Sequence, residues 1–143
     1  MRHKGSISED AIAMREDFYN SYKKVLASSS YIKLRDIVRK AINSPAPRFY
    51  VSPERALAVI QKIKKGESIA YMSESRKDMY SEIFNRVHSC LEANPYLSIR
   101  EAVRKVINSP APKFYINEGT AIVTLHYIKK QCTERLRQRF HVS

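Results

Sequence analysis

The sequence has no tryptophan, and it holds only three glycines and two cysteines among its 143 residues. So few glycines argue against a sheet-rich fold with many tight turns. Two cysteines, Cys90 and Cys132, are too few for a disulfide scaffold. The N-terminal segment lacks the apolar run that is typical of a signal peptide, and no apolar run in the sequence is long enough to cross a membrane. We therefore expect an all-α protein of the cytoplasm with reduced thiols.

Acidic charge is also scarce. The chain has 26 Lys and Arg residues against 14 Asp and Glu, a formal net charge of +12. Both halves are basic, with +7 on residues 1–70 and +5 on residues 71–143. A distributed excess of this kind favours a polyanionic partner, because each neutralised phosphate releases a counterion. The alternatives are an acidic protein partner, or a basic isoelectric point without a nucleic-acid role.

An internal repeat is the clearest feature that is present. Residues 33–51 read KLRDIVRKAINSPAPRFYV and residues 98–116 read SIREAVRKVINSPAPKFYI, with twelve of the nineteen positions identical. Such agreement indicates a tandem duplication of a unit the size of a small three-helix domain. We predict one three-helix unit over residues 1–70 and a second over residues 71–143, with an extended C-terminal helix in the second.

Hydrophobic periodicity places three helices in each copy. First helices are expected over about 8–27 and 75–92, where apolar residues recur every three or four positions. Second helices carry the strongest pattern, at positions 34, 37, 38, 41 and 42 and at the equivalent positions 99 to 107. An Asn-Ser-Pro sequence ends both second helices, because the residue before proline avoids the helical region. The third helices should begin after Ser52 and Asn117, and the last should reach about residue 140.

The connector SPAPRFYV lies between the second and third helices, and its two prolines predict an extended conformation. Three interpretations are open for it. Phe49 and Phe114 could fill the core, with the following tyrosines covering the seam. Arg48 or Lys113 could instead contact phosphate while a tyrosine stacks on a base. The connector could also be a docking strand for a partner protein.

Two tandem three-helix units, each with a short second helix and a capped third helix, resemble tandem helix-turn-helix proteins of the Myb or homeodomain-like kind. The resemblance implies DNA binding, with a third helix in the major groove. The chain departs from the Myb pattern because it has no tryptophan, and its connector is longer than a helix-turn-helix turn. It also resembles, more faintly, short proteins of gut bacteria and their phages.

The candidate contacts to nucleic acid are outward-facing residues of the second and third helices and of the connectors. Arginines are favoured because a guanidinium binds phosphate through two parallel hydrogen bonds. The full set is Arg35, Arg39, Arg48, Arg55, Lys62, Lys65, Arg100, Arg104, Lys113, Thr120 and Lys130.

Catalysis finds little support in the sequence. The isolated glycines exclude a phosphate-cradling loop, and the histidines and cysteines lack metal-ligand spacing. We expect no enzyme activity, no metal, no cofactor and no small-molecule substrate. The expected function is binding of nucleic acid, above all double-stranded DNA, as in a regulator or accessory factor. The alternative is a non-catalytic helical adaptor that docks on a larger assembly such as a polymerase, ribosome or virion.

Overall fold

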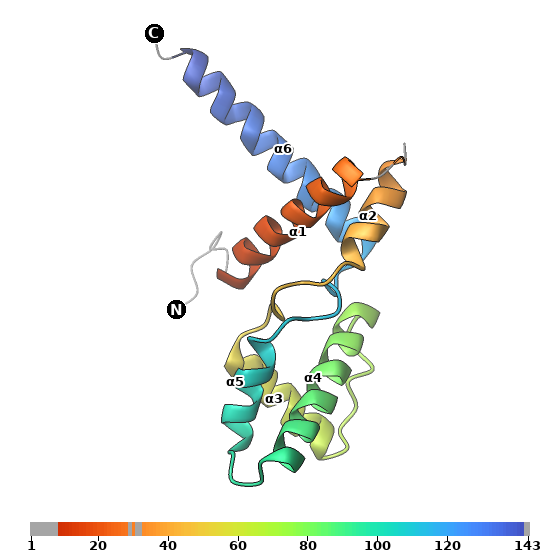
Figure 1. The fold of residues 1–143 in the computed structure, drawn as a ribbon, viewed down its shortest axis with the longest axis vertical. Helices are drawn as coiled ribbons and strands as arrows, with labels where there is room; N and C mark the ends of the chain where they lie inside the picture. Colours follow the sequence, from red (N-terminus) through yellow and green to blue (C-terminus); the bar gives the residue numbers. More distant parts are fainter. Residues whose placement is uncertain (1–8, 29, 31–32, 142–143) are drawn as a thin grey trace.

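The computed structural model describes residues 9–28, 30 and 33–141. Over these residues the chain forms six helices and no strand, so the expectation of an all-α fold is confirmed. The helices are α1 (Glu9–Ser28), α2 (Leu34–Ile42), α3 (Pro53–Lys64), α4 (Glu74–Ala93), α5 (Ile99–Ile107) and α6 (Glu118–His141) (Figure 1). Their bounds lie within one or two residues of the expected ones, although residue 8, the expected start of the first helix, is outside the described part.

The helix ends form where the local sequence supplies capping groups. The Ser98 hydroxyl accepts a hydrogen bond from the Glu101 amide at 3.1 Å and donates one to the Glu101 carboxylate at 2.9 Å. Ser52 caps α3 by accepting from the Arg55 amide at 3.2 Å. Beyond α3, Gly66 has a φ of +82°, the left-handed conformation that commonly follows the end of a helix. These boundaries therefore follow from sequence-local interactions.

The helices pack in two groups that do not follow chain order. The first cluster consists of α1, α2 and α6, and the second cluster consists of α3, α4 and α5 (Figure 1). The third helix of each repeat therefore packs with the first two helices of the other repeat. The predicted boundary between residues 70 and 71 separates the two copies of the sequence repeat. It does not separate the two packed groups of helices.

Two properties of the sequence account for this exchange. A proline-containing connector that is not helical carries the chain from its own second helix to the other group of helices. The repeated copies also present nearly the same apolar face on α2 and α5, so that either third helix finds a matching surface.

The two connectors cross and pair with each other between the clusters (Figure 1). Ala46 and Ala111 exchange both of their backbone hydrogen bonds, each at 2.9 Å, as an isolated antiparallel bridge. The Phe49 amide donates to the Ile107 carbonyl at 3.0 Å, and the equivalent Phe114 amide donates to the Ile42 carbonyl at 3.0 Å. Each of these hydrogen bonds thus joins a residue of one repeat to a residue of the other, as in a two-fold symmetric dimer.

The connector aromatics are part of the core. Phe49 is 1% exposed and Phe114 is 4% exposed. Phe114 meets Phe18 of α1 edge-on at 5.6 Å between ring centroids, and the guanidinium of Arg86 in α4 lies 5.2 Å from the Phe49 ring centroid. The phenylalanine of each repeat therefore fills the cluster that contains the other repeat's first helix. The core interpretation of these two phenylalanines is confirmed.

Candidate nucleic-acid interface

The arginines of α2 share one carboxylate. Glu118, the first residue of α6, places Oε1 at 2.9 Å from Nε of Arg39 and at 3.5 Å from Nε of Arg35. This acid reaches α2 because the helices are exchanged. An exposed ion pair of this kind stabilises the fold by only about 0–1 kcal/mol. It does, however, place a negative charge where a phosphate would have to bind.

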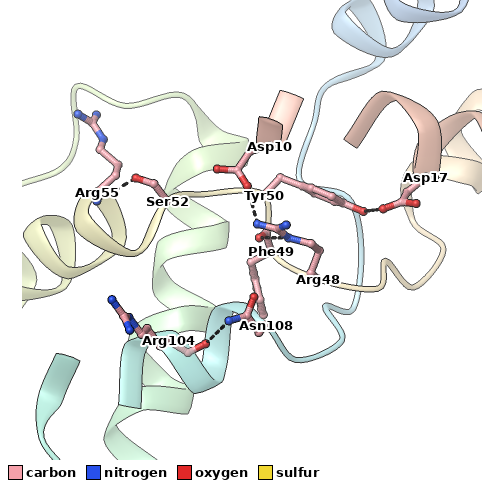
Figure 2. Close-up of polar contacts among 9 residues, drawn as sticks. All are labelled: Asp10, Asp17, Arg48, Phe49, Tyr50, Ser52, Arg55, Arg104 and Asn108. Atoms are coloured by element: carbon pink, nitrogen blue, oxygen red, sulfur yellow. Dashed lines mark hydrogen bonds and ion pairs between the residues drawn. The ribbon is translucent and has the colours of Figure 1, made fainter. Parts of the chain in front are cut away.

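The equivalent arginines of α5 have no such partner. Arg100 and Arg104 are exposed, and neither side chain forms an ion pair with an acid of residues 9–28, 30 or 33–141. The reason lies in the repeat, since Pro53 occupies the position in α3 that Glu118 occupies in α6. The hydrogen bond that Figure 2 draws at Arg104 involves its backbone carbonyl, which accepts from the Asn108 side-chain amide at 3.0 Å. Arg100 and Arg104 therefore lack the carboxylate partner that Glu118 supplies to the arginines of α2.

The candidate residues of α3, with Lys65 directly after it, lie in the same cluster as those of α5. Arg55, Lys62 and Lys65 are all exposed, and α3 packs directly against α5. In the view of Figure 2, the side chains of Arg55 and Arg104 extend to the same side. We call this set the α3–α5 basic surface: Arg55, Lys62, Lys65, Arg100 and Arg104. The exchange thus brings together candidates from two different repeats.

Arg48, in contrast, is held within the protein. Its guanidinium pairs with Asp10 of α1 and donates a second hydrogen bond, from Nε to the Phe49 carbonyl at 3.3 Å (Figure 2). The neighbouring Tyr50 hydroxyl donates to Asp17 at 2.6 Å. Burial, and then the Asp17 carboxylate, raise the pKa of Tyr50 above its ordinary value. This connector therefore ties α1 in place, and Arg48 has little freedom to contact phosphate.

The remaining candidates are more dispersed. Lys113 lies over the Tyr115 ring, with Nζ 5.3 Å from its centroid and 3.9 Å from a carboxylate oxygen of Asp78. Thr120 is exposed, and its amide donates to Oδ1 of the capping Asn117 at 2.7 Å. Lys130 is exposed on α6 and belongs to the first cluster. The structure does not gather Lys113 and Lys130 with the α3–α5 basic surface, whereas Thr120 lines a hollow together with Arg55 of that surface.

A second concentration of positive charge lies on the far half of α6, which projects beyond α1 and α2 (Figure 1). Every residue from 129 to 139 is exposed. This segment contains one acid, Glu134, and five basic residues: Lys129, Lys130, Arg135, Arg137 and Arg139. It forms a basic arm separate from the α3–α5 basic surface.

Comparisons with models of known protein families, with curated proteins and with solved structures found no match. The interpretation of these surfaces therefore depends on their geometry and charge. In the described part of the chain, no helix is long and apolar enough to cross a membrane, and no three His, Cys, Asp or Glu side chains are grouped to hold a metal ion. Cys90 and Cys132 are both free, the first half-buried and the second exposed.

Sequence reasoning missed one hollow of about 410 Å³ beside the connector crossing. Its lining includes Arg55 and Thr120, which occupy equivalent positions in the two repeats, together with Tyr71 and Arg76. A signal for Arg76 was present, because RKDMY at 76–80 echoes REDFY at 15–19. The sequence gives no comparable signal for Tyr71, which lies between the repeats.

Proposed function

We propose that this protein binds nucleic acid, double-stranded DNA first, through the α3–α5 basic surface. The observation that carries the proposal is the contrast between two equivalent pairs of arginines. Arg35 and Arg39 share the carboxylate of Glu118, whereas Arg100 and Arg104 form no ion pair with an acid in the described part of the chain. Free guanidinium groups on a protein of net charge +12 are suited to phosphate.

Phosphate contacts would supply most of the affinity. Each neutralised phosphate of a duplex contributes about 0.9 to the slope of log affinity against log salt. The helix-turn-helix resemblance would place α3 in the major groove, with Arg55 at its start and Lys62 and Lys65 near its end. In that arrangement α5 contacts the backbone, and the charge of Arg100 and Arg104 fixes the position of the protein on the duplex.

The repeat offers a matched test of this proposal. A labelled duplex of about 20 base pairs is titrated with protein at about 50 to 300 mM salt, and binding is followed by fluorescence anisotropy. The double variant R100Q/R104Q is expected to lower the salt slope by about 1.8 and to weaken binding at least ~10-fold at the low end of the range. The matched control R35Q/R39Q removes the same number of charges at equivalent positions and is expected to change both values much less.

Equal losses in the two double variants would contradict the proposal, since bulk charge alone would then explain binding. Absence of binding at the lowest salt would also contradict it. Because Arg100 and Arg104 are exposed, their substitution leaves the core intact, and far-UV circular dichroism verifies that the variants are folded.

A second candidate function is docking on a larger protein assembly. It is favoured by a hollow of about 430 Å³ between α1 and α6, lined by Ile12 and Tyr127, with Leu136 52% exposed farther along α6. Exposed apolar residues in one region are typical of protein contact sites. Affinity capture after nuclease treatment separates the two functions. A specific partner that is retained after nuclease treatment and lost in L136E supports docking, whereas release of all partners by nuclease supports nucleic-acid binding.

A further inference from the structure

The hollow of about 410 Å³ lies where three helices begin. It is lined by the starts of α3 and α4, by the residues that precede and open α6, and by Tyr71 between α3 and α4. Two arginines, Arg55 and Arg76, contribute to the lining, and no acidic residue does. The volume falls in the range of about 300–1,000 Å³ that is typical of small-molecule sites.

The charged side chains that line this hollow are both positive. Neither Arg55 nor Arg76 forms an ion pair with an acid among the described residues. Two acids that open neighbouring helices are already paired: Glu74 with Lys77 at 2.7 Å, and Glu118 with the arginines of α2. Asp10 lines an adjoining hollow that also includes Arg76, but its carboxylate is bound by Arg48. Two guanidinium groups are therefore available to one anion.

An aromatic ring completes the hollow. Tyr71 is 67% exposed, which is unusual for a large side chain that is also held in place. The Lys62 ammonium donates a hydrogen bond to the Tyr71 hydroxyl at 3.2 Å and lies 5.2 Å from the ring centroid. A fixed and exposed aromatic ring next to basic residues is the arrangement on which nucleobases stack.

We infer that this hollow binds a nucleoside monophosphate group, with the phosphate between Arg55 and Arg76 and the base against Tyr71. The group belongs either to a free nucleotide or to the 5′ end of a nucleic-acid strand, and the second source rests on the proposed function. The partial positive charge at the starts of three helices adds to the attraction for phosphate. The ligand is bound and not transformed, because the lining offers no acid, histidine or cysteine to carry out chemistry.

Calorimetric titrations with AMP, adenosine and inorganic phosphate test the inference. AMP is expected to bind at least ~10-fold more tightly than adenosine. Arg76→Gln should weaken both AMP and inorganic phosphate about 10-fold, whereas Tyr71→Ala should weaken AMP alone, by about 5-fold or more. The control Lys130→Gln, an exposed charge change on α6 outside the hollow, should leave AMP binding unchanged.

Single strands of one sequence, with and without a 5′-phosphate, distinguish the two sources. A preference for the phosphorylated strand that disappears in Arg76→Gln identifies a strand end, and AMP binding without that preference identifies a free nucleotide. Equal affinities for AMP and adenosine, or an AMP affinity unchanged by Arg76→Gln, would overturn the inference. Arg76 and Tyr71 lie outside the α3–α5 basic surface, so these results are independent of R100Q/R104Q. Absence of duplex binding by the unmodified protein, with AMP binding intact, would contradict the proposed function alone.

Discussion

A double-mutant cycle between Phe18 and Phe114 tests the exchanged core directly. Phe18 belongs to α1 of the first repeat and Phe114 to the connector of the second, yet their rings meet edge-on at 5.6 Å. Both are almost fully buried, at 0% and 4% exposure. Replacing each with leucine keeps most of the apolar volume, so each single variant should lose about 1 kcal/mol in the free energy of unfolding. The ring pair itself contributes about 0.5–1.5 kcal/mol beyond its burial.

Urea unfolding followed by circular dichroism supplies the four free energies of unfolding. We expect the double variant to lose about 0.5–1.5 kcal/mol less than the sum of the single losses, because the ring pair is broken only once. The control cycle pairs Phe18 with Phe49, the phenylalanine of its own repeat, and should be additive within about 0.5 kcal/mol. Coupling of Phe18 to Phe49 with additivity toward Phe114 would refute the exchange, since it would place each connector in the core of its own repeat.

Three further predictions follow from individual contacts. Tyr50→Phe removes a partly buried hydroxyl hydrogen bond and should cost about 1 kcal/mol, more than Tyr115→Phe, whose hydroxyl bonds to no described residue. Because the pKa of Tyr50 is raised in the folded state, its stabilising contribution is complete below about pH 10 and is lost as the pH rises above that value. In urea unfolding, the difference in stability between the unmodified protein and Tyr50→Phe should therefore be smaller at alkaline pH. Gly66→Ala should lower the unfolding free energy by about 1 kcal/mol because of its φ of +82°, whereas Gly119→Ala, in helical conformation, should not lower it in the same assay. Glu118→Gln should tighten duplex binding in the anisotropy assay by freeing two arginines of α2, and unchanged or weaker binding would contradict that role.

Much of the local structure could be predicted from the sequence. Apolar periodicity located the helices, and Ser52, Ser98 and Gly66 marked ends that the capping hydrogen bonds and the positive φ confirm. Burial of Phe49 and Phe114 was one of the three interpretations that the connector left open, and it depends on contacts with the other repeat. The helix ends depend on interactions between residues that are close in the chain.

The pairing of helices could not be predicted in the same way. The repeats carry nearly the same apolar side chains on α2 and α5, so periodicity alone does not distinguish packing within a repeat from packing between repeats. The connector resolves this ambiguity through backbone hydrogen bonds between residues 65 positions apart, such as those of Ala46 and Ala111. Such bonds leave no trace in side-chain patterns.

The candidate site shows the same division. The sequence correctly placed the predicted arginines of α2 and α5 on the surface, but it gave no way to separate the two pairs. Arg39 meets Glu118 across 79 residues of chain, and that contact exists only in the exchanged arrangement. The hollow beside the crossing, which joins Arg55 to Arg76, likewise depends on how the repeats come together.

A spin label on Cys132 measures the exchange most directly. Cys132 is exposed on α6 and lines a hollow together with Ile12, Arg15 and Tyr19 of α1. With Cys90→Ser to leave one thiol, a nitroxide on Cys132 should broaden the amide NMR signals of these α1 residues. A control that mixes labelled, isotopically unenriched protein with enriched, unlabelled protein measures any contribution from neighbouring molecules. Packing of α6 with α1 predicts strong broadening within α1 and little within α4. Broadening of α4 with α1 unaffected would contradict it, because α6 would then pack with the helices of its own repeat.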